Sequence, residues 1–305
     1  MDNLYLVVIV SYNPSEKDLN SIRKIIETYN YVVIVDNSSE DQKEVCRLKT
    51  ENCSVICNKS NKGLAFALNQ GCRFGVEHNF KYCLLLDQDS VMTDGSLEQL
   101  IKIHENLGDK CGIASPKIFL RNGENFVESN YLVKTCYGFK KKRVENEPLK
   151  VLINITSGSM IKLETWKKVG EFRSDFFIEG IDDEYALRLN SMGYDVIISN
   201  EAKLVQQYGN MSENEIWGKK VYTTNHSALR RTYCYRNKIV IMKEYFFKEK
   251  SYVFFQILSL IRKLLLIIIF EDKKCEKLTG IFRGIKYGLQ GKMGKLTIKN
   301  NQISN

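Results

Sequence analysis

The stretch Leu84-Leu85-Leu86-Asp87-Gln88-Asp89-Ser90 decides the fold. Its leucines follow Tyr82 and Cys83, and this apolar run ends in two carboxylates and a hydroxyl. Such a run predicts a buried strand of a parallel sheet, and ligands bind at the carboxyl ends of such strands. Asp87 and Asp89 are therefore candidate ligands of Mg²⁺ or Mn²⁺, hard cations that in turn hold phosphate oxygens. The alternative is that Asp87 caps the strand while Asp89 or Ser90 caps the next helix.

Upstream of this stretch, apolar runs of strand length alternate with segments of helical periodicity. Strands are predicted at residues 4–10, 31–35, 54–57 and 82–86, and helices from residue 14, over 44–49 and from residue 64. This alternation is typical of an α/β fold with a doubly wound parallel sheet. No G-x-G-x-x-G follows the first strand, so the pattern does not predict the dinucleotide-binding version.

Polar residues also follow the other strands, at the edge where Asp87 and Asp89 are expected. They occur in the segments Ser11-Tyr12-Asn13, Asp36-Asn37-Ser38 and Asn61-Lys62-Gly63. The last of these precedes a helix, and a helix start with a lysine and a glycine suits phosphate. The alternatives are a helix cap at residue 36 and a solvated lysine at residue 62. One edge thus collects the acid Asp36, the candidate metal ligands Asp87 and Asp89, and the cation Lys62. This combination predicts a site for a nucleotide diphosphate.

Composition limits the class of protein. A length of 305 residues fits one large domain or a domain with an appendage, and 44% hydrophobic residues are typical of a soluble globular chain. The nine cysteines are an odd number without a C-x-x-C pair, so we expect reduced thiols and a cytosolic protein. The first four residues lack the positive region of a secretion signal.

The positive charge is concentrated at one end of the chain. Residues 216–305 contain 19 Lys and Arg against 5 Asp and Glu, whereas residues 1–215 have a net charge of −5. This asymmetry predicts an anionic partner, either a membrane surface or nucleic acid. We therefore expect a catalytic domain over residues 1–215 and a basic helical region over residues 216–305.

The most apolar stretch is FFQILSLIRKLLLIIIF, residues 254–270, which is short for a membrane span. A narrow polar face is formed by Gln256, Ser259, Arg262 and Lys263. Residues 252–270 are thus predicted to form an amphipathic helix that lies on an anionic membrane with its cationic residues at the headgroups. The alternative is a buried helix that packs on the catalytic domain or on a second subunit.

Four segments resemble the N-terminal half of the family 2 glycosyltransferases with the GT-A fold. They are VVIVSYNP (7–14), IVDNSS (34–39), NKGLAFALNQG (61–71) and YCLLLDQDS (82–90). The form DQDS resembles the rhamnosyltransferase-like branch of bacterial polysaccharide biosynthesis. The resemblance implies a Rossmann-like, mostly parallel central sheet flanked by helices, followed by a helical membrane-associating region. It also implies a nucleotide-sugar donor, with Asp36 at the base and Asp87 and Asp89 at the diphosphate and a Mg²⁺ or Mn²⁺ ion. The implied donor contacts are Ser11, Tyr12, Asn13, Asp36, Asn61, Lys62, Gly63, Asp87, Gln88 and Asp89.

A second acidic segment, FFIEGIDDEYALRL, occupies residues 176–189. Acids in a first helical turn are favoured by the helix dipole, so each of them has a structural explanation. An inverting sugar transfer needs one carboxylate that takes the proton of the acceptor hydroxyl. The resemblance, aligned on Arg188, implies Asp182 as this base, with Glu184 two residues further on. Asp183 is the main competitor, and Glu179 and Glu184 remain open as further alternatives.

Later motifs add candidate contacts. HSALRRTYCYRN, residues 226–237, resembles the family's histidine-arginine-tyrosine block, and the alternative is a basic helix face. Weak contacts with the acceptor or a diphosphate are expected from Gly158, Ser159, Glu184, His226, Arg230, Arg231 and Arg236. Gln206 stands where the family usually has a histidine near the metal, and it is a candidate third ligand. Between the motifs, strands are predicted at 118–120, 151–153 and 193–198. The charged segment 140–150 is predicted to be a solvated loop, and the alternative is a surface loop near the acceptor.

The expected function is an inverting glycosyltransferase that transfers a sugar, with rhamnose favoured, in O-antigen or capsule synthesis. The donor would be dTDP- or UDP-linked and the acceptor a polyprenyl-diphosphate-linked glycan, at the inner face of the plasma membrane. The alternatives are another hexose or galactofuranose and, in a different class, a non-catalytic nucleotide-sugar-binding protein. The acid-rich strand edge argues against nucleic-acid binding, and a homodimer is possible.

Overall fold

The computed structural model describes residues 3–122, 125–136, 138–206, 212–216 and 218–296. Its centre is one sheet with the strand order β10-β12-β6-β11-β4-β1-β2-β3, extended by β5 beside β12 and by β7 beside β6. Its first half alternates strands with helices as predicted: β1 (Tyr5–Ser11), α1 (Glu16–Thr28), β2 (Val32–Asp36), α2 (Gln42–Cys46), β3 (Cys53–Cys57), α3 (Leu64–Glu77) and β4 (Tyr82–Asp87). The neighbours β1–β2, β1–β4 and β2–β3 are parallel. The expectation of an α/β fold with a mostly parallel sheet is confirmed.

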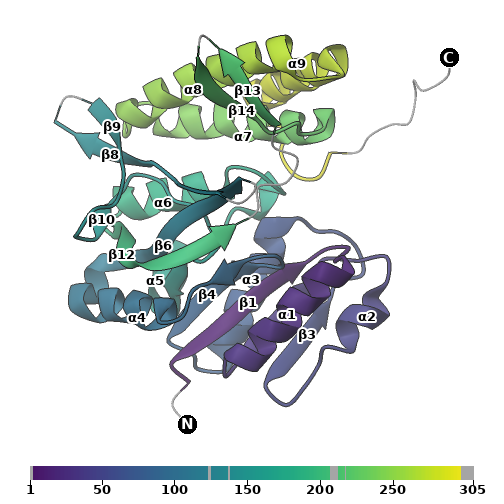
Figure 1. The fold of residues 1–305 in the computed structure, drawn as a ribbon, viewed down its shortest axis with the longest axis vertical. Coiled ribbons are helices and arrows are strands. Elements are labelled where there is room, and N and C mark those ends of the chain that lie inside the picture. Colours follow the sequence, from purple (N-terminus) through teal and green to yellow (C-terminus); the bar gives the residue numbers. More distant parts are fainter. Residues whose placement is uncertain (1–2, 123–124, 137, 207–211, 217, 297–305) are drawn as a thin grey trace.

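The second half extends the sheet and adds two hairpins. Its strands are β5 (Val91–Met92), β6 (Cys111–Asn122), β7 (Asn125–Glu128), β8 (Tyr131–Thr135), β9 (Gly138–Lys142), β10 (Leu149–Lys150), β11 (Met160–Lys162), β12 (Asp195–Gln206), β13 (Ser212–Ile216) and β14 (Lys219–Thr223). Its helices are α4 (Ser96–Leu107), α5 (Leu163–Val169), α6 (Ile181–Ser191), α7 (Ala228–Tyr245), α8 (Lys250–Phe270) and α9 (Lys274–Gln290). Helices α7, α8 and α9 gather at the end of the molecule farthest from α1 and α2 (Figure 1).

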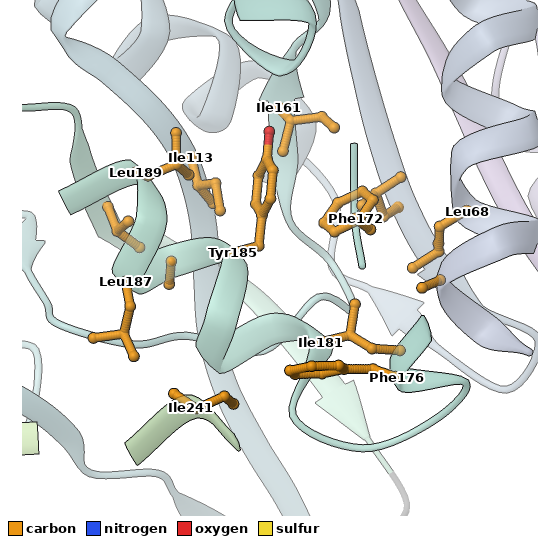
Figure 2. Packing of buried hydrophobic residues seen from close by; sticks show 14 of the residues in the cluster. Leu68, Ile113, Ile161, Phe172, Phe176, Ile181, Tyr185, Leu187, Leu189 and Ile241 are labelled. Carbon is orange, nitrogen blue, oxygen red and sulfur yellow. The ribbon is translucent and has the colours of Figure 1, made fainter. Parts of the chain in front are cut away.

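Two hydrophobic clusters cover the two faces of the sheet. Leu85 of β4 belongs to the cluster formed with α3, α5 and α6, whereas Leu84 and Leu86 belong to the cluster formed with α1 and α4. All three leucines are at most 3% exposed, which explains why the apolar run of this strand is continuous. Figure 2 shows Tyr185 of α6 packed beside Ile113 and Ile161 of the sheet, with Ile241 of α7 below the same helix. The core is therefore continuous from the sheet to the C-terminal helices.

Two local predictions are wrong. Residues 151–153 form no strand. The Val151 N–H still bonds to the Val196 carbonyl of β12, but the Leu152 N–H bonds to the Leu132 carbonyl of β8, so the chain leaves the sheet edge after residue 151. The segment 140–150 is not simply a solvated loop, because its first three residues belong to β9, which pairs with β8. Burial of residues 151 and 152 accounts for the apolar pattern without a strand.

Helix α9 lies unusually close to α7 because glycines recur along the interface. A Cβ on Gly280 would come within 2.4 Å of the Ala228 carbonyl oxygen, and one on Gly284 within 2.5 Å of the Thr232 carbonyl oxygen. Such distances exclude any side chain at these positions. The glycines at the C-terminal end thus serve helix packing.

Helix α8 has two faces, and their orientation differs from the prediction. Two residues of its predicted polar face are turned toward the protein: Gln256 is buried, and Lys263 lines a cavity, whereas Arg262 is exposed. Its apolar side is solvent-exposed through Phe254, Ile257, Leu258, Ile261, Leu265, Ile268 and Ile269. Among the described residues it is the one helix long and apolar enough to cross a membrane. The prediction that both Arg262 and Lys263 point to headgroups is wrong for Lys263, because that side chain turns inward.

Candidate active site

The polar residues that follow the strands lie at one edge of the sheet. Ser11 is in register with Asp36 across β1 and β2, and Val10 is in register with Asp87 across β1 and β4. Parallel pairing therefore brings the ends of three strands together. The side-chain contacts described below extend this edge to the start of α3.

Asp36 is fully buried and held by its own loop. Its carboxylate accepts hydrogen bonds from the Ser39 N–H at 3.0 Å, from the Ser39 hydroxyl and from Gln42 Nε2 at 2.8 Å. The alternative of a helix cap at residue 36 is wrong, because α2 is capped by Asp41, which accepts a hydrogen bond from the Lys43 N–H at 3.2 Å. The contacts of Asp36 keep its carboxylate in one orientation at the strand end, as recognition of a base would require.

The loop before α3 is tied to the end of β2 and to the turn before α6. The Lys62 N–H donates to Asn37 Oδ1 at 3.0 Å, and Asn37 Nδ2 donates to Asn61 Oδ1 at 3.1 Å. Gly63 has φ +92°, and a Cβ there would lie 2.5 Å from the Phe177 carbonyl oxygen. Only glycine fits this position, and the Lys62 side chain is exposed beside it.

The loop after β1 contacts the loop after β4. The Tyr12 N–H donates to Gln88 Oε1 at 3.1 Å, while the Tyr12 ring is about half exposed. Asn13 has φ +45°, and its Oδ1 accepts from the Glu40 N–H at 2.8 Å. The buried Ser11 hydroxyl has no hydrogen-bond partner among the described residues. All the predicted donor contacts thus lie along one edge.

A cavity of about 870 Å³ opens beside this edge. Asp87 and Asp89 line one side, and Asp182 at the start of α6 lines it as well. Further walls come from Gln206 at the end of β12, from the turn before α7 and from Lys263 of α8. The two acidic motifs, 93 residues apart between Asp89 and Asp182, therefore face one space.

The pair Asp87 and Asp89 has the chemistry of a cation site. Burial and the negative charge of Asp89 raise the pKa of Asp87 to about 6, and burial raises the pKa of Asp89. Gln206 Nε2 donates to Asp87 Oδ2 at 3.1 Å, so its amide is within reach of the same position. No group of three His, Cys, Asp or Glu side chains that could hold a metal occurs in the described part of the chain. Two carboxylates and an amide would leave the remaining positions of a Mg²⁺ or Mn²⁺ ion to water and substrate phosphates, which is how these ions usually bind.

The neighbouring carboxylates of α6 have different surroundings. Asp182 faces the cavity, and burial together with the charge of Asp183 raises its pKa to about 7. Asp183 is turned away, and its Oδ2 accepts from Tyr252 and Gln256 of α8 and pairs with Lys238 of α7. An accessible carboxylate with a pKa near neutrality suits a general base, whereas a buried carboxylate with three side chains on one oxygen does not.

The other acidic candidates are paired. Glu184 is 3% exposed and bonds to Arg188 Nη2 at 2.8 Å, while Arg188 also donates to two backbone carbonyls. It lies outside the cavity lining, so the predicted acceptor contact at Glu184 is corrected to a structural ion pair. Glu179 lines the cavity but pairs with Arg230 at 2.5 Å.

Of the four predicted basic contacts, three line the cavity and one does not. His226, Arg230 and Arg231 line the cavity, and burial and nearby Arg230 lower the pKa of His226 to about 4. Arg231 also forms a buried ion pair with Glu271. Arg236, however, is fully buried and donates to the carbonyl oxygens of residues 175, 176 and 294. The predicted diphosphate contact at Arg236 is therefore corrected to a role in the fold.

In the turn before β11, the predicted contacts Gly158 and Ser159 do not line the cavity, but the two residues before them do. Ser159 is buried and its hydroxyl bonds to Ser115, Asn154 and the Ile155 carbonyl, and Gly158 packs on Pro116. Neither residue lines the cavity, whereas Thr156 and Ser157 do. Sequence reasoning also missed Lys263 as a cavity residue. The sequence did place Lys263 on the narrow polar face of its helix, and a polar face can be turned toward a protein interior as well as toward a membrane surface.

Comparisons with known proteins agree with this geometry. The family model "Glycosyl transferase family 2" matches residues 6–170. The dTDP-rhamnosyl transferase RfbF of Shigella flexneri is 30% identical over 244 residues, which cover 79% of this chain and 80% of that protein.

Solved structures share the fold at low sequence identity. GalNAc-T7 with UDP, GalNAc and Mn²⁺ superposes with a TM-score of 0.59 at 15% identity, over 94% of this chain and 56% of that chain. Residues 1–349 of S. aureus TarS superpose with a TM-score of 0.59 at 13% identity, over 93% and 80% of the two chains. The parallel sheet, the acidic strand end and the family match lead to one conclusion: the chain belongs to family 2 of the glycosyltransferases and has the GT-A fold.

Proposed function

We propose that the protein is an inverting glycosyltransferase that transfers rhamnose from a nucleotide-diphosphate donor during bacterial surface polysaccharide synthesis. The observation that carries this proposal is that Asp182 faces Asp87 and Asp89 in one cavity. A volume of about 870 Å³ accommodates a sugar between the two acidic motifs. The similarity to a dTDP-rhamnosyl transferase supports rhamnose and a dTDP-linked donor, with UDP-linked sugars as the second choice.

The donor would lie along the strand edge. Asp36 would bind the base, and the loop of Asn61, Lys62 and Gly63 would hold the nucleotide near the N-terminus of α3. Asp87 and Asp89, with Gln206 as a third ligand, would hold a Mg²⁺ or Mn²⁺ ion. When bound, such an ion neutralises the charge that develops on the diphosphate leaving group.

Asp182 would act as the general base. Its carboxylate takes the proton of the acceptor hydroxyl while that oxygen attacks the anomeric carbon, and the bond from this carbon to the diphosphate oxygen breaks. The nucleoside diphosphate leaves from the opposite face, so one displacement inverts the configuration. A raised pKa supports this role because a base is most effective near the working pH.

The acceptor would enter at the side of the cavity formed by α7 and α8. Arg230, Arg231 and Lys263 contribute positive charge there, which suits a lipid-linked diphosphate glycan. The exposed apolar face of α8 would lie on the anionic inner surface of the plasma membrane, with nearby lysines at the headgroups. Under this proposal the protein is a cytoplasmic enzyme that is peripherally attached to the membrane. A second copy of the chain is the other partner that could cover this face.

A donor screen tests the proposal. Purified protein is incubated with Mn²⁺, a lipid-diphosphate acceptor and one donor at a time. The nucleoside diphosphate should be released faster from dTDP-rhamnose than from UDP-linked hexoses or UDP-linked galactofuranose. Asp182→Asn should lower kcat by about 10²–10⁴-fold and leave donor affinity within a few-fold. Glu179→Gln is the matched control from the same cavity and should retain most activity. Donor binding without release by the wild-type protein would instead favour the non-catalytic alternative.

A further inference from the structure

One carboxylate oxygen of Asp183, Oδ2, has three side-chain partners from the C-terminal helices. This oxygen accepts hydrogen bonds from the Tyr252 hydroxyl at 2.8 Å and from Gln256 Nε2 at 3.2 Å, and Lys238 Nζ forms an ion pair with it. The residue is 7% exposed, so these contacts are largely shielded from water. Among the described residues, no buried polar atom of these four side chains lacks a partner, which is the condition for such a network to be strong.

These partners come from two helices that lie far along the chain. Lys238 belongs to α7, and Tyr252 and Gln256 belong to the inner face of α8. Asn237 of α7 adds to the effect because its Nδ2 donates to the carbonyls of residues 176, 178 and 179, just before α6. The first turn of α6 is thus held from the C-terminal helices.

That first turn also carries the proposed base. Asp182 precedes Asp183 directly and faces the cavity, so a shift of Asp183 moves Asp182 against the acceptor. A misplacement of about 1 Å can cost about 10²-fold in rate. Stability alone does not explain this network, because a buried ion pair often contributes no more to the free energy of unfolding than apolar packing of the same volume.

We infer that Asp183 is a positioning residue, through which the inner face of α8 holds the catalytic base in place. This inference rests on the proposed function in that Asp182 is the base. It adds that α8 belongs to the catalytic machinery through Tyr252 and Gln256.

Two tyrosine hydroxyls provide a matched comparison. Tyr252→Phe removes one hydrogen bond to Asp183, whereas Tyr235→Phe removes the hydrogen bond at 3.0 Å from α7 to the Leu260 carbonyl of α8. Both variants lose one buried hydroxyl contact involving α8, and only the first touches the network. We expect Tyr252→Phe to lower kcat about tenfold, the effect of one hydrogen bond to a charged group, with the KM of the donor unchanged. Tyr235→Phe should stay within about twofold of wild type.

A pH titration gives a readout that overall stability does not move. The charged groups that act on Asp182 most strongly are Asp183 on its own helix, Lys238 from α7 and Glu179 in the preceding turn. The other titratable groups in the same cavity are Asp87, Asp89, His226, Arg230, Arg231 and Lys263. Asp183→Asn removes one negative charge, so the pKa of Asp182 should fall. Carbon-13 carboxylate titration of the protein without donor measures this directly, and so it does not depend on turnover.

These experiments distinguish the positioning role of Asp183 from the proposed function of the protein. Equal losses of kcat in Tyr252→Phe and Tyr235→Phe, or an unmoved pKa of Asp182 in Asp183→Asn, would overturn the positioning role while leaving the proposed function intact. Lack of turnover by wild-type protein with every donor would overturn the proposed function, and the titration would still decide whether Asp183 acts on Asp182.

Discussion

The raised pKa of Asp182 predicts a pH dependence of the sugar transfer. Burial and the charge of Asp183 move the pKa of this carboxyl from its ordinary value of 3.8 to about 7. A general base works in its ionised form, so activity should rise with pH through this value. The ionised fraction would be about a hundredth at pH 5, about a tenth at pH 6 and about nine tenths at pH 8. An aspartate with an ordinary pKa would be ionised over that whole range.

The assay is nucleoside-diphosphate release with donor, Mn²⁺ and acceptor all saturating. Under these conditions kcat reports the loaded enzyme, whereas kcat/KM also reports groups of the free enzyme. The pKa of Asp87 is raised to about 6 in the free protein, so its protonation should affect kcat/KM through donor binding. A kcat that is constant between pH 5 and pH 8 would refute the assignment of Asp182 as a base with a pKa near 7.

Three further results are expected. Asp87→Asn should weaken donor binding about tenfold or more with Mn²⁺ and change it little without the ion, as titration calorimetry can measure. Ile261→Gln combined with Leu265→Gln should strongly reduce flotation with anionic liposomes, because each apolar side chain contributes about 1.5–3 kcal/mol on burial and glutamine adds no charge that the lipid attracts. Val91→Gln, at an exposed apolar site elsewhere, should leave flotation unchanged. Arg236→Met should lower the free energy of unfolding in urea by about 2–5 kcal/mol, because it leaves buried carbonyls without donors, and donor affinity of the folded variant should be unchanged.

The first half of the fold could be predicted from local patterns. Continuous apolar runs of strand length, alternating with helical periodicity, are enough to indicate a parallel sheet, and parallel pairing brings the strand ends together whatever the loops do. Asp36 and Asp87 could therefore be assigned to one edge before their positions were known. The second half was harder, because an apolar pattern such as that of residues 151–153 indicates burial but not the hydrogen bonds that define a strand.

The orientation of α8 shows a second limit. Periodicity divides a helix into a polar and an apolar face, but it does not say which face meets the protein. A polar face turned inward requires buried partners, and here Asp183 supplies one for Gln256 while the catalytic cavity accommodates Lys263. An apolar face turned outward then requires an external surface to cover it. Both requirements are tertiary, so residues 250–270 alone could not decide between them.

The assignment of the base depends on the same kind of information. Asp182 and Asp183 are adjacent on a helix, where successive side chains point about 100° apart, so one of them faces the cavity and the other does not. Their local sequence is nearly equivalent for this purpose. The difference comes from partners 55, 69 and 73 residues later in the chain, which bind Asp183 and leave Asp182 accessible. Exchanging the two roles would require the C-terminal helices to release a buried carboxylate from an ion pair and two hydrogen bonds, so the C-terminal region determines which aspartate can act as the base.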